Sequence, residues 1–210
     1  MKIAIIGASG KAGQFILDEA VAREHEVTAI VRNAGRINNS QVEVIEKNIF
    51  DIQAKDVKKY DIIVNAFKSP QGQEEQHVEA GKVLIDALKG QQSRLIVVGG
   101  AGSLYVDEET RLYETADFPK AYLPTATQMG KDLAQLQNSQ NVNWTYISPG
   151  AFFDAEGKRS GSYQKGKDKL FFNNQGDSYI SYADFAIAVL DEAEQGKHLN
   201  ERIAVVGDRA

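Results

Sequence analysis

A glycine-rich segment between an apolar run and an amphipathic stretch is the feature of this sequence that most limits its fold. Residues 3–6 are apolar and mostly β-branched, as in a strand that is covered on both faces. Residues 11–23 place apolar side chains at helical spacing, and residues 7–13, with the sequence GASGKAG, join the two. Glycines at such a junction let the backbone turn tightly. The segment therefore predicts a strand that runs directly into a helix, as in a βαβ unit.

The rest of the chain repeats this alternation of strand and helix. Apolar runs predict further strands at 27–31, 42–45, 62–64, 95–98, 144–147 and 203–206. Helical periodicity predicts helices between them, including one that ends near Gly90, one around Leu133 and Leu136, and one at about 182–194. This order is typical of an α/β, Rossmann-like fold: a doubly wound, mainly parallel sheet flanked by helices. We expect a single domain over residues 1–210, with substrate-side loops at about 100–124 and 151–178.

Composition and charge exclude several functions. The 24 basic residues against 29 acidic ones give a net charge of −5, which argues against a nucleic-acid partner. The chain has no Cys, and its three His residues are isolated, so neither thiol chemistry nor a metal site is expected. No apolar stretch approaches the ~20 residues of a membrane span. We therefore expect a cytoplasmic protein, monomer or homodimer, that contacts a small-molecule acceptor and neither nucleic acid nor membrane.

The glycine segment also predicts a cofactor. Its G-x-x-G-x-x-G spacing is a variant of the dinucleotide fingerprint, in which the backbone approaches a pyrophosphate and the helix N-terminus offers free N–H groups. A glycine turn that serves only helix–sheet packing is the alternative. The predicted pyrophosphate-binding residues are Gly7, Ala8, Ser9, Gly10, Lys11, Ala12 and Gly13.

The end of the second strand bears on the choice of cofactor. NAD sites usually carry Asp or Glu there to bind the ribose hydroxyls. This chain has Arg32 and Asn33 instead. The guanidinium of Arg32 suits a 2′-phosphate, and no adjacent carboxylate would repel it. The sequence therefore favours NADP(H) over NAD(H); a solvated surface Arg32 is the alternative.

The ends of the other strands predict the rest of the cofactor site. Asp51 and Ile52 follow the third strand and are expected near the adenine, although Asp51 is also a candidate helix N-cap. Small residues after the remaining strands would permit close approach, and Phe67 would either border the nicotinamide or pack. These candidates are Asn65, Ala66, Phe67, Gly99, Gly100, Pro149 and Gly150.

Several segments together resemble a known family. They include Gly7–Gly10, Val31–Asn33, Val97–Leu104, Trp144–Pro149 with Phe152 and Phe153, and Ser178–Asp184. In this order they resemble the atypical short-chain dehydrogenase/reductases, in particular bacterial NADH-flavin reductase-type proteins near the NmrA-like proteins and biliverdin-IXβ reductases. The resemblance implies a Rossmann fold, a nicotinamide cofactor and hydride transfer to a free flavin or another planar acceptor. The flavin would be a substrate that is not tightly bound.

One departure from ordinary short-chain dehydrogenases limits the chemistry. Those enzymes carry a Tyr and a Lys four residues apart on one helix, as acid and as cofactor ligand. Here the nearest equivalents are Thr127 and Lys131, and Tyr163 with Lys167 lies in a loop. Lys131 is a candidate for holding the nicotinamide ribose, with a solvated helix Lys as the alternative. Alcohol oxidation by the usual mechanism is therefore disfavoured.

The acceptor side has its own candidates. Ser103, after the fifth strand, is the best-placed hydroxyl for orienting an acceptor, although it would also suit a turn. Tyr105, Phe152 and Phe153 are candidate stacking surfaces, and each would also suit the core. Arg159 belongs to a basic segment, 158–169, that would attract an acceptor's anionic groups or simply be solvated.

The sequence thus supports two functions. The first is an NAD(P)H-dependent oxidoreductase that reduces a free flavin, quinone or tetrapyrrole by direct hydride transfer. The alternative is an NmrA-like redox sensor that binds NADP(H) without turnover. A sugar-nucleotide epimerase is disfavoured because the helical Tyr–Lys pair is absent.

Overall fold

Eight strands form one twisted sheet. The computed structural model describes all residues of the chain, 1–210. The strand order is β3-β2-β1-β4-β5-β6-β10-β8. Neighbouring strands are parallel except for β10 and β8, which are antiparallel. The strands are β1 (Lys2–Ile6), β2 (Glu26–Val31), β3 (Glu43–Glu46), β4 (Ile62–Asn65), β5 (Arg94–Val98), β6 (Asn143–Pro149), β10 (Glu201–Val206) and β8 (Gln164–Gly166).

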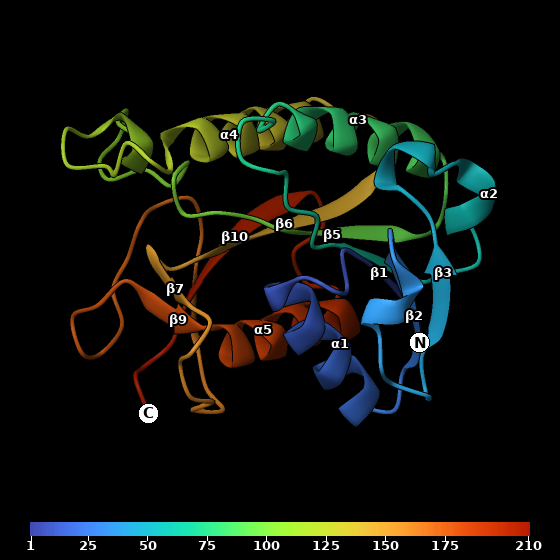
Figure 1. Cartoon of the computed structure of the whole chain (residues 1–210). Helices are drawn as coiled ribbons and strands as arrows, with labels where there is room; N and C mark the ends of the chain where they lie inside the picture. The colour runs from blue at the N-terminus through green and yellow to red at the C-terminus, as the bar shows by residue number, and fades with distance from the viewer.

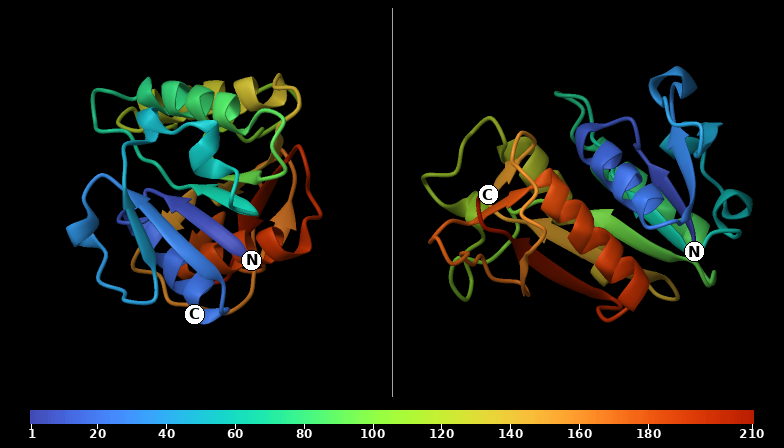
Figure 2. Two further views of the ribbon diagram at one scale, coloured as in Figure 1. Left: turned by 90° about the vertical axis from the view of Figure 1, so that its right-hand side faces the viewer. Right: turned by 90° about the horizontal axis from the view of Figure 1, so that it is seen from below.

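Helices cover both faces of this sheet (Figure 1). α3 (Gln76–Leu88) and α4 (Leu123–Gln137) lie side by side on one face, and α1 (Lys11–Ala22) and α5 (Tyr182–Gln195) on the other. The short helix α2 (Ala54–Val57) follows β3. The left view of Figure 2 shows the resulting three layers, and the right view looks onto the face that α1 and α5 cover. The predicted single-domain, Rossmann-like fold class is confirmed.

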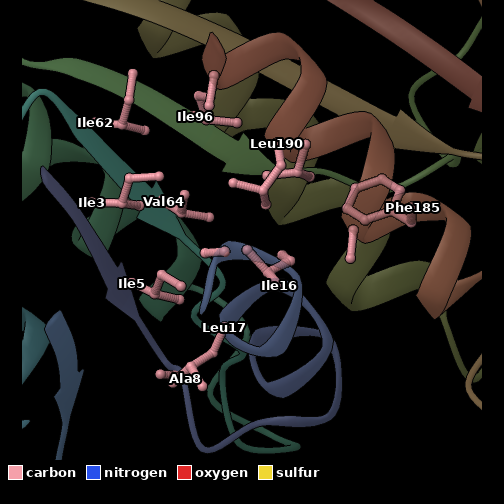
Figure 3. Close-up of a cluster of buried hydrophobic side chains, with 14 of the residues drawn as sticks. Ile3, Ile5, Ala8, Ile16, Leu17, Ile62, Val64, Ile96, Phe185 and Leu190 are labelled. Carbon is pink, nitrogen blue, oxygen red and sulfur yellow. The ribbon is translucent and has the colours of Figure 1, made fainter. Parts of the chain in front are cut away.

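Two hydrophobic clusters, one on each face of the sheet, explain the unbroken apolar strands. Ile3 and Ile5 of β1 pack with residues of α1 and α5, including Ile16 and Phe185, as Figure 3 shows. The alternate residues of β1, among them Ile6, pack beneath α3 and α4. Because both faces of each central strand are buried, the strands read as continuous apolar runs and not as alternating ones.

The predicted loop at 151–178 and the residues directly after it hold three short strands that the sequence did not predict. β7 (Phe152–Asp154) and β9 (Tyr179–Ser181) pair in parallel as a separate two-stranded sheet. β8 lies within the predicted 151–178 loop and pairs with the last strand. Each of these strands has three residues, which is too short to display a period of two. No helix of the structure is both long and apolar enough to span a bilayer.

A buried carboxyl group lies in the contact between α3 and α4. Asp132 of α4 is 4% exposed, and its Oδ1 lies 1.7 Å from where a Cβ on Gly81 of α3 would be. Its one side-chain partner is Gln135 Nε2, at 2.9 Å. Burial raises the pKa of Asp132 to about 7. A glycine at position 81 is therefore needed to admit this carboxyl group between the helices.

We predict that this carboxyl group makes the protein less stable as the pH rises. Between about pH 4 and pH 7 the folded state retains a proton on Asp132 that the unfolded state has lost, because its pKa moves from 3.8 to about 7. The free energy of unfolding therefore falls across this window. Asp132→Asn should remove this dependence and be more stable at pH 8, by at most about 4 kcal/mol. Urea unfolding of both proteins at pH 5 and pH 8 measures the difference; equal pH slopes would contradict the assignment.

Candidate functional site

The carboxyl ends of the central strands meet at one edge of the sheet, at the point where the strand order reverses. β1 lies between β2 and β4, so successive connections leave it in opposite directions. Ligands of open α/β sheets bind at such a switch point. The residues that follow these strands are 7–13 after β1, 65–67 at the end of β4, 99–100 after β5 and 149–150 at the end of β6. We call these segments together the carboxyl edge.

The backbone of residues 7–13 is packed too closely for side chains at two positions. Gly7 has φ +76°, and a Cβ there would lie 2.6 Å from the carbonyl oxygen of Ala66. A Cβ on Gly13 would lie 2.3 Å from the carbonyl oxygen of Gly7. β1, the start of α1 and the end of β4 therefore touch through backbone alone. This close contact between backbone segments is what the glycine spacing predicts.

The N-terminus of α1 leaves its donors free at this edge. Gly10 is the N-cap residue and has no side chain to cap the helix. Gln14 N donates to Gly10 O at 2.9 Å, whereas the amides of Lys11, Ala12 and Gly13 donate to no group of the chain. The first turn has no acidic side chain. Free N–H groups at the positive end of a helix form a binding site for a pyrophosphate.

The end of β2 presents Arg32 to solvent. Its guanidinium is exposed and forms no ion pair, whereas Asn33 Oδ1 accepts a hydrogen bond from Gly35 N at 3.0 Å and so caps a short 3-10 turn. Glu46 of β3 pairs with Val31 in register, and its Oε2 accepts a hydrogen bond from Ala34 N at 2.9 Å. The carboxylate of Glu46 is thus bound to the backbone two residues beyond Arg32, and it forms no ion pair with Arg32.

The residues predicted near the adenine lie in two environments. Asp51 is exposed and its carboxylate has no hydrogen-bond partner, while Ile52 is buried in the core beneath α3. The N-cap residue of the turn that contains Asp51 is Asn48, so Asp51 is not a cap. Its carboxylate is thus free for a ligand, and Ile52 contributes packing.

The residues after β4 form a polar turn and an aromatic cluster. Asn65 Oδ1 accepts a hydrogen bond from Phe67 N at 3.1 Å. Phe67 contacts Phe50 and His77 edge to face, with ring centroids 5.9 and 5.6 Å apart. Phe67 therefore packs on one side, and its half-buried ring stays a candidate for bordering the nicotinamide. Burial lowers the pKa of His77 to about 4, so this side chain is neutral at physiological pH and supplies no proton.

Ser103 does not lie at the open edge. It is 5% exposed, and both its carbonyl oxygen and its Oγ accept hydrogen bonds from Arg202 Nη1, at 2.9 and 3.0 Å. Arg202 pairs in register with Tyr146 of β6, three residues before that strand ends at Pro149. The segment after β5 has therefore folded back beneath α4. The structure gives the hydroxyl of Ser103 a structural partner that the sequence did not reveal.

Lys131 lies on the outer side of α4. Gly130 faces the ring of Tyr113, and Asp132 faces α3. At about 100° per residue, the intervening Lys131 points away from the sheet. It is exposed and forms no ion pair. The side chain of α4 that does reach the carboxyl edge is Met129, whose sulfur would lie 3.3 Å from a Cβ on Gly100.

The aromatic candidates separate into three places. Tyr105 lies apart from the carboxyl edge, where its ring stands 5.6 Å from the guanidinium of Arg111. Phe152 is 53% exposed and stacks on Tyr179 at 5.8 Å. Phe153 is half-buried, in the contact described next. Only the last two, on β7 directly after β6, lie beside the carboxyl edge.

Phe153 belongs to an aromatic wall next to α1. Its ring lies 4.0 Å from that of Tyr182, which in turn lies 6.0 Å from Phe15 in α1, edge to face. All three side chains are partly exposed. The wall therefore joins α1 to the segment after β6, beside the carboxyl edge. Tyr182 lies within a segment quoted above, but nothing in the sequence indicated that it would meet Phe15.

Arg159 is held by an acidic residue of α1. Its guanidinium binds Glu19, which also binds Arg23 at 2.8 Å. The neighbouring Ser160 and Gly161 donate backbone hydrogen bonds to Asp184, at 3.0 and 2.9 Å. The Ser178–Asp184 segment thus anchors the loop that carries Arg159. The positive charge of Arg159 is neutralised locally, which leaves it a weak candidate for binding an acceptor.

Comparisons with known proteins agree with this geometry. A family model described as NAD(P)H-binding matches residues 7–194. This chain belongs to the NAD(P)H-binding family. It is 58% identical to the uncharacterized protein YwnB of Bacillus subtilis strain 168, over 99% of each chain.

Solved structures show the same fold over the whole chain. SP1627 of Streptococcus pneumoniae TIGR4, named as an inferred NADH-flavin reductase, shares 40% identity and superposes with a TM-score of 0.94, covering 99% of this chain and 100% of that one. ChuY, an anaerobilin reductase of Escherichia coli O157:H7, superposes with a TM-score of 0.79 over 98% of this chain and 97% of its own. At 18% identity, the likeness to ChuY shows the fold alone.

The residues present fit the ligand of this family. The close backbone contacts at Gly7 and Gly13 leave no side chain over the start of α1, and the amides of Lys11–Gly13 are free. Residues 7–13 would hold the pyrophosphate, Arg32 and Asp51 would flank the adenosine half, and Gly100 and Gly150 would border the nicotinamide half.

We predict that Gly7→Ala raises the Kd for NADPH more than a hundredfold. The new Cβ would require both a left-handed φ and displacement of the Ala66 carbonyl. Gly90→Ala is the matched control, because Gly90 has φ +74° with nothing within 4 Å of its Cβ position. Both variants should lose about 1 kcal/mol through φ, and only Gly7→Ala should lose binding. Circular dichroism monitors folding, and fluorescence titration with NADPH measures the Kd. Equal NADPH affinity in the two variants would contradict the assignment of residues 7–13, which we call the cofactor cradle, as the pyrophosphate-binding segment.

Proposed function

We propose that this protein is an NAD(P)H-dependent reductase, with NADPH preferred, that acts on a planar acceptor such as a free flavin, a quinone or a tetrapyrrole. The observation that carries the proposal is the pairing of a backbone cradle for the dinucleotide with an aromatic wall, Phe15, Phe153 and Tyr182, beside the same edge. The family membership and the similarity to SP1627 support it.

Bound NADPH would supply a hydride to the acceptor. The chain's own contribution is positioning. Residues 7–13 bind and orient the pyrophosphate, and the wall offers rings against which a planar acceptor stacks. No acid–base pair faces this edge: Lys131 points outward and His77 is neutral. A flavin suits such a site, because its proton can come from solvent.

The absence of an acid–base pair also favours a second function. A protein that binds NADP(H) as a redox sensor and regulates a partner needs the same cradle and no catalytic side chains. The two functions differ in turnover, and their cofactor binding is the same.

Steady-state oxidation of NADPH tests the proposal. The acceptors are FMN, riboflavin and a benzoquinone, and Gly7→Ala serves as the control without a cofactor site. We expect oxidation above the buffer rate with at least one acceptor and none with the variant. NADPH binding without turnover across this panel would reject the reductase and favour the sensor.

Arg32 should determine the preference for NADPH. Arg32→Gln removes a charged hydrogen-bond donor to the 2′-phosphate, an interaction worth about 1.5–3 kcal/mol, so the Kd for NADPH should rise about 10- to 100-fold. The Kd for NADH should not change. Arg36→Gln removes a second exposed arginine nearby and serves as the control. An equal effect of Arg32→Gln on both cofactors would contradict the assignment.

A further inference from the structure

Two adjoining cavities form a polar groove outside the carboxyl edge. Their volumes are about 450 and 260 Å³, and both are lined by Gln137, Asp168 and Arg202. The smaller cavity reaches Ser103 and Arg111, and the larger reaches Trp144 and Lys167. We call this space the α4 groove. Its size is that of a small-molecule site.

The α4 groove is separate from the cofactor cradle. Trp144 lies near the start of β6, and Arg202 near the start of β10. In a parallel sheet these positions are toward the amino edge, opposite the ends that carry residues 7–13 and 149–150. The segment 99–103 runs between the two regions, because it begins at the carboxyl edge and ends at Ser103 in the groove. A ligand of the groove would therefore not be the dinucleotide.

Arg202 gives the groove a buried, incompletely paired donor. Its side chain is 2% exposed, and its Nε donates to Asp168 Oδ1 at 2.7 Å. Nη1 donates twice to Ser103, and Nη2 donates to the carbonyl oxygen of Asp168 at 3.2 Å. A guanidinium has five N–H groups. One N–H of Nη2 is thus left without a partner, at a residue that lines both cavities.

Two further cations line the groove without a carboxylate partner. The guanidinium of Arg111 lies 5.6 and 5.9 Å from the rings of Tyr105 and Tyr113, and its Nη1 donates to the Tyr113 hydroxyl at 2.6 Å. Lys167 forms no ion pair either. Of the acidic residues that line the groove, Asp168 is engaged by Arg202, which leaves Glu201 as the one unpaired carboxylate. The groove therefore has a positive balance within a chain of net charge −5.

From this arrangement we propose that the α4 groove binds a small organic anion with two anionic groups, of the dicarboxylate or phosphate-ester class. One group would bind between Arg111 and the free N–H of Arg202, and the second would bind near Lys167. Bidentate and charge-assisted donors of this kind favour carboxylate or phosphate oxygens. This proposal goes beyond the reductase function and does not depend on it.

The test uses Trp144, the single tryptophan of the chain, as a reporter. Its emission is recorded during titration of the whole protein, without cofactor, with malate, succinate and 3-phosphoglycerate, each of which carries two anionic groups. Sodium chloride at matched ionic strength is the control. We expect a saturable change with at least one of these anions and none with chloride.

Variants locate the binding. Arg111→Gln and Lys167→Gln should each weaken it at least tenfold; Lys167 is exposed, so its replacement leaves the fold intact. Lys165→Gln is the matched control, since Lys165 carries the same charge two residues away but stands 6.0 Å from the ring of Tyr163 outside the groove. No saturable change with any of the three anions, or unchanged affinity in both groove variants, would overturn the proposal. Because no turnover is measured, a failure here is distinct from a failure of the reductase function.

Discussion

The contact on which the rest of the structure depends is the one between the backbones of β1, α1 and β4. Gly7 and Gly13 allow the first turn of α1 to rest on the end of β1, and Gly7 also meets the carbonyl of Ala66 after β4. Any side chain at either position would force these segments apart. The same contact directs the free amides of α1 toward the edge where the strand order reverses. The fold and the proposed cofactor site therefore both depend on the absence of a side chain at Gly7 and Gly13.

The orientation of α4 decides which chemistry is available. Met129 faces the carboxyl edge, Gly130 faces the loop that holds Ser103, and Asp132 fits against α3. That rotation turns Lys131 to solvent, so the helix cannot provide the acid–base pair of ordinary short-chain dehydrogenases. The α4 groove runs along another side of the same helix, where Gly130, Leu133 and Gln137 line it. The basic segment 158–169 is only partly neutralised. Glu19 pairs with Arg159, whereas Lys167 forms no ion pair and lines the α4 groove.

The sequence predicts those parts of the structure whose causes are local. Strands buried on both faces appear as apolar runs, and the glycine spacing predicts the turn from β1 to α1, which the structure contains. Contacts between distant residues are not visible in the same way. Arg202 and Ser103 are 99 positions apart, and Arg159 and Glu19 are 140 apart. Glu46 reaches the end of β2 through strand pairing, which composition does not determine. The predicted cradle thus followed from local geometry, whereas the surroundings of Ser103, Lys131 and Arg159 required the tertiary structure.

A crystal structure of the protein with NADPH would show whether residues 7–13 bind the pyrophosphate. We expect the pyrophosphate within hydrogen-bond distance of the amides of Lys11–Gly13, and the 2′-phosphate beside Arg32. The nicotinamide should then lie near Gly100 and Gly150, with one face open toward Phe153 and Tyr182. A dinucleotide bound elsewhere, or one whose pyrophosphate makes no contact with residues 7–13, would contradict this assignment.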